Sequence, residues 1–105
     1  MFGKKKKEDE GLSLARERIT FAKMPDEDSY AKELVIKLRE GSPLVINFED
    51  INEISANKYL AFLSGAAVAF DGKIVKIKNN VFLFAKKEDF IDGSLKEFIN
   101  EVAKR

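Results

Sequence analysis

The residue types that usually carry enzyme chemistry are scarce in this sequence. It has no His and no Cys, so it lacks the commonest general base at neutral pH and the thiolate nucleophile, and no Cys/His metal site can form. The acid pairs Glu49/Asp50 and Glu88/Asp89 are adjacent along the chain. Adjacent side chains do not converge on one face of a helix or strand. We therefore expect no catalytic residues, no metal site and no cofactor, and a protein that acts by binding other macromolecules.

The bulk composition describes one small globular domain. The chain has 105 residues, of which 45% are hydrophobic, and its 19 basic residues balance its 18 acidic ones. That balance argues against a nucleic-acid partner, which would need a surplus of basic residues on one face. The longest largely apolar stretch, Tyr59–Phe70, is too short to span a bilayer, and Lys4–Lys7 is followed by acids rather than by the apolar part of a signal peptide. We expect a cytoplasmic protein.

The elements follow from hydrophobic periodicity and turn residues. Residues 1–15, rich in lysine and acids, are predicted to be a flexible segment, and residues 16–105 the folded domain. Within the domain, the expected elements are a strand at 18–23, a helix from 26–29 to Gly41, a strand at 44–48, a helix at 54–70, a hairpin of 73–77 with 81–85, and a C-terminal helix from about Leu95. Phe90-Ile91 is a candidate for one more short strand.

This order, β-α-β-α-β-β plus a C-terminal helix, predicts a two-layer α/β (α+β) sandwich whose mixed sheet carries helices on one face. The last strand is apolar at every position, so it presents apolar side chains to both faces of the sheet. We expect a second copy of the chain to cover the second face and so form a homodimer. The alternative is that the C-terminal helix folds back over it. The expected dimer interface consists of Val75, Ile77, Val81, Phe82, Leu83 and Phe84.

An ordered set of short motifs runs from Pro43 to Ala85. In order, these motifs are Pro43–Phe48, Asn57–Ala66, Phe70–Ile77 and Val81–Phe84. The set resembles the core domain of the SepF family, the membrane-linked partners of the tubulin-like division protein FtsZ. The most specific piece is Phe62-Leu63-Ser64-Gly65. The chain departs from the family pattern where Lys58 and Ala61 replace an Arg and an Asp. Its short N-terminal zone is more like that of archaeal members.

The resemblance implies a non-enzymatic cell-division scaffold. Such proteins dimerise, can form higher polymers, and bind the C-terminal tail of FtsZ in a groove of the core domain. Carried over by position, the groove residues are Lys58, Tyr59, Phe62 and Leu63. An apolar tail with acidic residues needs an aromatic-lined groove with a cation nearby, which these side chains supply. The alternative is that Phe62 and Leu63 belong to the hydrophobic core.

The resemblance also implies a peripheral contact with the inner face of the cell membrane at the division site. The residues that could make it are Met1, Phe2, Lys4, Lys5, Lys6 and Lys7. Each Lys near an anionic surface contributes about 1 kcal/mol, and a buried Phe about 2 kcal/mol. The sum gives a weak, reversible anchor that dimerisation strengthens. The alternative is a solvated tail, which the acids at 8–10 favour.

One rival function is a phospho-regulated interaction module. The strand at 44–48 followed by Ile54-Ser55-Ala56 is similar to a sulfate-transporter/anti-sigma-antagonist (STAS) domain, in which a Ser that opens a helix is phosphorylated. Ser55 would be the switch. Such domains carry a Gly soon after the Ser and alternate strands with helices to the end, whereas a hairpin is predicted here.

Overall fold

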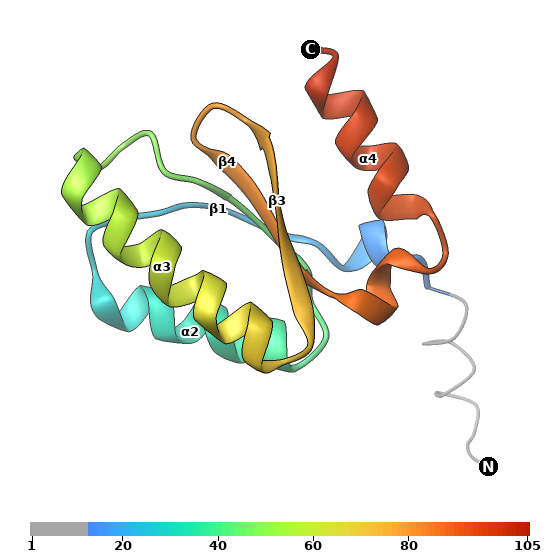
Figure 1. Ribbon diagram of the computed structural model, residues 1–105, viewed down its shortest axis with the longest axis horizontal. Helices are drawn as coiled ribbons and strands as arrows, with labels where there is room; N and C mark the ends of the chain where they lie inside the picture. The colour runs from blue at the N-terminus through green and yellow to red at the C-terminus, as the bar shows by residue number, and fades with distance from the viewer. Residues whose placement is uncertain (1–12) are drawn as a thin grey trace.

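A computed structural model describes residues 13–105. In chain order its elements are η1 Ala15–Arg18, β1 Thr20–Lys23, α2 Asp28–Arg39, β2 Leu44–Asn47, α3 Glu53–Ala69, β3 Gly72–Lys78, β4 Val81–Lys86, η2 Lys87–Phe90 and α4 Ser94–Ala103 (Figure 1). The predicted order of strands and helices is confirmed. The extra strand at Phe90-Ile91 is wrong: Phe90 ends the short helix η2, and Gly93 already caps α4, which leaves too little chain for a strand.

The four strands form one mixed sheet in the order β1-β2-β4-β3. β1 and β2 are parallel because α2 carries the chain back between them, whereas β2, β4 and β3 pair antiparallel. The register aligns Phe21 with Val45, Val45 with Leu83, and Leu83 with Val75 across all four strands. The expected α+β fold with a mixed sheet is therefore present, and β4 is a central strand with two faces to bury.

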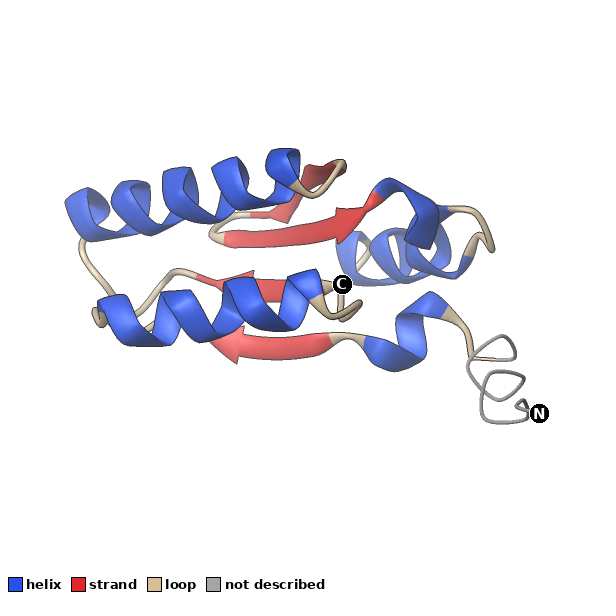
Figure 2. Cartoon of the chain, turned by 90° about the horizontal axis from the view of Figure 1, so that it is seen from below, coloured by secondary structure: helices blue, strands red, loops and turns tan. Residues whose placement is uncertain are grey.

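The helices α2 and α3 lie side by side against one face of the sheet, which we call the α2/α3 face (Figure 2). Leu34 and Leu38 of α2 and Leu63 of α3 meet Phe84 of β4 in the main hydrophobic core, and each of them is at most 2% exposed. α2 ends at Arg39, followed by Gly41 with φ of 103°. The left-handed backbone of Gly41 turns the chain back into β2.

The helix α4 lies apart from α2 and α3 and packs on the other face of the sheet (Figure 1). This α4 face carries Val45, Val75, Ile77, Val81, Leu83 and Ala85. Leu95 of α4 is fully buried against it, and Phe98 is partly buried there. The C-terminal helix α4 therefore covers the second face of the sheet within the single chain, which is the alternative that the sequence left open beside a second copy. The flexible segment predicted from the sequence ends at Ala15. In the structure Ala15 is buried in this second cluster, so it packs with the folded domain.

Among the glycines of the described residues, Gly72 has the closest backbone neighbours, and it gives the first testable prediction. At Gly72, the first residue of β3, an added Cβ would lie 2.5 Å from the carbonyl oxygen of Ala85 and 2.9 Å from that of Ala67. Two backbone atoms cannot move aside as a flexible side chain can. Gly72→Ala should therefore lower the free energy of unfolding by about 2 kcal/mol, measured by urea denaturation.

Gly65 provides the matched control for this prediction. It lies exposed within α3, and an added Cβ there would meet nothing within 4 Å. Because Ala is the better helix former, Gly65→Ala should raise the free energy of unfolding by roughly 1 kcal/mol. Equal stability of Gly72→Ala and the unmodified chain would show that the sheet and α3 are less tightly packed than described.

Candidate functional site

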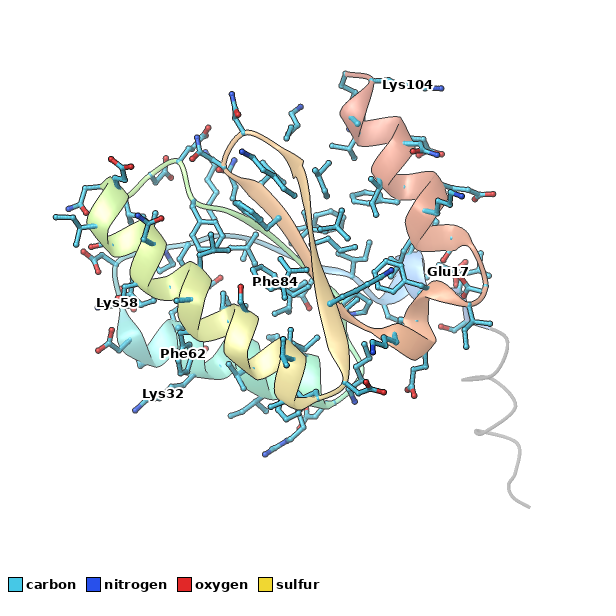
Figure 3. The ribbon with its side chains drawn as sticks, viewed as in Figure 1. Glu17, Lys32, Lys58, Phe62, Phe84 and Lys104 are labelled. Carbon is cyan, nitrogen blue, oxygen red and sulfur yellow. The ribbon has the colours of Figure 1, made fainter. Side chains whose placement is uncertain are left out.

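A groove of 220 Å³ lies between α2 and α3 on their outer side. Its lining comes from both helices and consists of Asp28, Ala31, Lys32, Lys58, Tyr59 and Phe62. Figure 3 shows Lys32, Lys58 and Phe62 close together on these helices. The groove offers an aromatic edge in Phe62, which is 45% exposed, with two cations beside it. This combination suits a short peptide with apolar and acidic side chains.

The N-cap of α3 fixes where this helix begins, and the helical period then separates its buried side chains from those that face the groove. The Asn52 side chain accepts a hydrogen bond of 2.8 Å from the Ser55 backbone N–H, so the helix begins at Glu53. From that start, Tyr59 and Leu63 fall four residues apart on the buried side. Phe62 is one residue out of phase with Leu63 and therefore points outward.

Tyr59 joins the core to the groove wall. Its side chain is buried, whereas its hydroxyl lies 2.9 Å from Oδ1 of Asp26 and 3.0 Å from Oδ1 of Asp28. Asp26 also accepts a 2.9 Å bond from the Ser55 hydroxyl, and Asp28 accepts a 3.1 Å bond from Nζ of Lys58. These bonds tie the start of α2 to the first half of α3, so one wall of the groove is built by polar contacts.

The same contacts fix the charges at the groove. The Ser55 hydroxyl, followed by that of Tyr59, lowers the pKa of Asp26. The Lys58 ammonium lowers the pKa of Asp28, and that carboxylate in turn raises the pKa of Lys58. Burial of the ring raises the pKa of the Tyr59 hydroxyl. At neutral pH both carboxylates are therefore ionised, Lys58 is a cation and Tyr59 is a neutral hydrogen-bond donor.

Three of the four groove residues predicted from the sequence line this groove, namely Lys58, Tyr59 and Phe62. Leu63 does not, because it is fully buried in the main core. Sequence reasoning missed Asp28 and Lys32. They lie four residues apart on α2, a spacing that places them on one helix face, but nothing in the sequence shows that this face lies beside Lys58. Ser55 is the residue that a STAS-like switch would phosphorylate. Its hydroxyl already donates a hydrogen bond to the carboxylate of Asp26, and the negative charge of that carboxylate would oppose a phosphoryl group on Ser55.

The six strand residues expected at a dimer interface are divided between the two faces of the sheet. Phe82 and Phe84 belong to the α2/α3 face, and the other four, Val75, Ile77, Val81 and Leu83, belong to the α4 face. Successive side chains of a strand point to opposite faces, so they could not all share one surface. Leu83 is fully buried beneath α4 and Phe84 is fully buried beneath α2 and α3, so neither side chain offers a surface to a second copy.

The expected membrane residues Met1, Phe2 and Lys4–Lys7 lie outside the described residues. Within residues 13–105, no helix has both the length and the apolar composition needed to cross a membrane. The same range holds no group of three or more acidic side chains placed to bind a metal ion.

Comparison with known proteins identifies the family. The family model described as cell division protein SepF matches residues 23–88. A cell division protein SepF of Alkaliphilus oremlandii is 37% identical over 67 residues, which cover 64% of this chain and 46% of that protein. The SepF of Alkaliphilus metalliredigens is 36% identical over 73 residues, covering 70% of this chain and 49% of that protein.

A third relative agrees with these two. The SepF of Listeria monocytogenes serotype 4a is 35% identical over 71 residues, which cover 68% of this chain and 47% of that protein. The chain thus spans about half the length of the curated relatives it matches. The residues matched by the family model make up more than half of the chain and include the whole groove between α2 and α3. The chain belongs to the SepF family of cell-division proteins.

Proposed function

We propose that this chain is a non-enzymatic scaffold that binds the C-terminal tail of FtsZ in the groove between α2 and α3. The observation that carries the proposal is the half-exposed Phe62 beside the cation Lys58, at the centre of the segment matched by the family model. An aromatic side chain left open to solvent on a helix is a typical anchor for a partner. The ammonium groups of Lys32 and Lys58 complement acidic residues of a tail.

The groove is small, which limits what the tail can place in it. A volume of 220 Å³ accommodates one or two side chains rather than a folded domain. Asp28 holds Lys58 at 3.1 Å and so directs one cation along the groove wall. Within the described residues Lys32 has no ion-pair partner, so it is free to bind a tail carboxylate. A short peptide with one apolar anchor and a nearby acid fits this arrangement.

Two further parts of the proposal concern assembly. The chain forms a homodimer, and dimers assemble further into higher polymers. A dimer holds two FtsZ tails where a single chain holds one. It contacts the inner face of the cell membrane at the division site through Met1, Phe2 and Lys4–Lys7. Four cations attract anionic lipid, and the resulting weak attachment is strengthened when two copies act together.

Removal of the aromatic anchor tests tail binding. Phe62→Ala should weaken the affinity for a fluorescent FtsZ C-terminal peptide by about tenfold, measured by fluorescence anisotropy. The matched control is Val68→Ala, which removes an apolar side chain that is 66% exposed on the same helix but outside the groove. The control should bind like the unmodified chain. Equal affinity of the two variants would place the tail elsewhere, provided both retain native circular dichroism.

The groove wall should make stability depend on pH. Because folding lowers the pKa values of Asp26 and Asp28, their stabilisation is present above the ordinary Asp pKa of about 4 and is lost as the pH falls through the lower folded-state values. Tyr59→Phe removes a hydroxyl that bonds both carboxylates. The variant should be less stable at pH 7 and lose less stability on acidification, measured by urea denaturation from pH 7 to pH 2.

Tyr30→Phe is the control for this measurement. Tyr30 is the other tyrosine of the chain and packs against the main core. No hydrogen bond of its hydroxyl occurs among the described residues, so its removal should leave the pH profile unchanged. The groove wall would not contribute to acid sensitivity if the Tyr59→Phe profile ran parallel to that of the unmodified chain.

Deletion of residues 1–7 tests the membrane contact. The shortened chain should bind vesicles that contain anionic lipid at least tenfold more weakly, because the four lysines and Phe2 are removed. Its affinity for the FtsZ peptide should stay unchanged, since the groove lies in the folded domain. Co-sedimentation with vesicles measures the first quantity. Unchanged sedimentation would exclude this segment as the anchor.

A further inference from the structure

A second groove, which we call the α4/β1 groove, lies on the side of the sheet opposite to the groove between α2 and α3. Its volume is 600 Å³, and small-molecule sites typically measure about 300–1,000 Å³. Its walls are the C-terminal half of α4 and the strands β1, β2 and β4, and its lining contains two cations and no acid. The two grooves share no lining residue, so this one is a separate candidate site.

The groove exists because one helix is narrower than the sheet. A helix with its side chains is about 10 Å wide, whereas the outer two of four strands about 4.8 Å apart are separated by about 14 Å. Phe21 on the edge strand β1 stays 61% exposed, although the centroid of its ring lies 5.7 Å from that of Phe98 of α4. A large aromatic side chain that remains open to water beside other apolar side chains marks a binding surface.

The sheet wall of the groove changes from apolar to charged along its length. One row of the register pairs Phe21 with Val45, and a second row, two residues further along, pairs Lys23 with Asn47 and Asn47 with Val81. Side chains two residues apart on a strand point to the same face. The apolar row and the more polar row therefore follow each other on the α4 face.

The helix wall changes in the same way. Phe98, Val102 and Arg105 all line the groove, and their spacing of four and three residues places them on one face of the helix. Because Phe98 contacts Phe21, the aromatic ends of the two walls coincide. At the other end, the last turn of α4 and the tip of the β3–β4 hairpin lie at the same end of the molecule (Figure 1). The groove is thus apolar at one end and cationic at the other.

Two cations at this end are available to a ligand. Lys78 is the register partner of Val81, which places it on the α4 face beside the groove. Arg105 is part of the lining itself. Neither cation forms an ion pair within residues 13–105.

The other charges near the groove already have partners. Nζ of Lys23 lies 3.2 Å from Glu49 and 3.8 Å from Asp50. The carboxylate of Glu101, near the end of α4, accepts bonds of 2.9 and 3.3 Å from Arg16. The unpaired charge at the cationic end is therefore positive, and it complements an anionic group.

The lining suits an alkyl chain better than a peptide. A peptide brings backbone N–H and C=O groups, which must find hydrogen-bond partners when they are buried. The one neutral polar side chain of the lining is Asn47, and its Oδ1 already accepts a 2.9 Å bond from the Glu49 backbone N–H. An alkyl chain has no such groups. An anionic head on that chain would form charge-assisted contacts at the cationic end.

We propose that the α4/β1 groove is a lipid site, which takes one acyl chain of an anionic phospholipid and holds its phosphate with Arg105 and Lys78. The inference goes beyond the proposed tail binding and the proposed attachment through Met1, Phe2 and Lys4–Lys7, because it assigns lipid recognition to the folded domain itself. A lipid held there places the α4 side of the sheet against the bilayer surface. The groove between α2 and α3 then faces away from the bilayer.

A fluorescent reporter in the groove tests occupation. The chain has no Trp, so Phe21→Trp introduces a single indole at the aromatic end. Dodecyl phosphate, titrated below its micelle concentration, should shift the emission to shorter wavelength, because the alkyl chain displaces water from the ring. Val68→Trp is the matched control: Val68 is 66% exposed and lines none of the grooves described for the chain. The control should show no shift.

Two further probes separate the chain from its head group. Inorganic phosphate, which lacks the alkyl chain, should cause no shift in Phe21→Trp. Dodecyl trimethylammonium carries the same alkyl chain with a cationic head, and it should bind at least tenfold more weakly than dodecyl phosphate.

Charge reversal tests recognition of the head group. In the Phe21→Trp chain, Arg105→Glu should weaken the binding of dodecyl phosphate by about tenfold, measured by the same titration. Lys104→Glu is the matched control, since Lys104 lies outside the lining and points away from the β3–β4 hairpin (Figure 3). Its affinity should equal that of the chain without it. Both positions are exposed at the end of α4, so neither change disturbs the core.

Deletion of residues 1–7 separates this site from the proposed N-terminal anchor. The shortened Phe21→Trp chain should keep the full emission shift with dodecyl phosphate. If that shift is kept while the full chain fails to sediment with anionic vesicles, only the N-terminal anchor is overturned.

The lipid site is overturned by equal affinities of Arg105→Glu and Lys104→Glu, or by equal binding of the anionic and cationic amphiphiles. It is also overturned if the emission is already shifted without any amphiphile. Residues 1–7 occupy the groove if their deletion removes such a shift, and a second copy occupies it if the shift grows with protein concentration. A shift with the FtsZ peptide but none with dodecyl phosphate would assign the groove to a peptide instead.

Discussion

One constraint organises this molecule: its central strand β4 is apolar on both sides, so both faces of a small sheet must be buried. Phe84 points to one face and Leu83 to the other, and neither is exposed. The first face is met by two helices, which is why α2 and α3 lie side by side and form a groove between them. The second is met by the single helix α4, which leaves Phe21 61% exposed and is joined to η1 by the hydrogen bonds between Arg16 and Glu101.

Much of the fold follows from local sequence signals. The nearly continuous apolar run Leu44–Phe48 predicts a buried strand, which the structure forms at Leu44–Asn47, and Asn79-Asn80 predicts the hairpin turn, where Asn80 adopts φ of 64°. The wrong strand at Phe90-Ile91 has a local cause, since two apolar residues do not define a period. Phe90 is partly buried in the second cluster at the end of a short helix, while Ile91 is 83% exposed.

The candidate site was predictable only in part, because its two walls come from different helices. The family resemblance located Lys58, Tyr59 and Phe62, yet placed Leu63 with them. From Leu60 onward α3 is almost entirely apolar, so its periodicity does not reveal which residues face the core; the packing of α2 decides it. Asp26 and Asp28 were missed because their partners Ser55, Tyr59 and Lys58 lie about 30 residues away in sequence, and no local pattern reports such a contact.

The separation of the two faces has a thermodynamic consequence for a scaffold. A ligand shifts an equilibrium only if its binding energy differs between the two states. The groove is lined by residues of α2 and α3, none of which belongs to the cluster beneath α4. The groove and the α4 face therefore share no side chain, so a contact made at one of them does not use residues of the other. The proposed tail binding uses the helix layer of α2 and α3 alone, so it leaves the packing of α4 on the sheet unchanged.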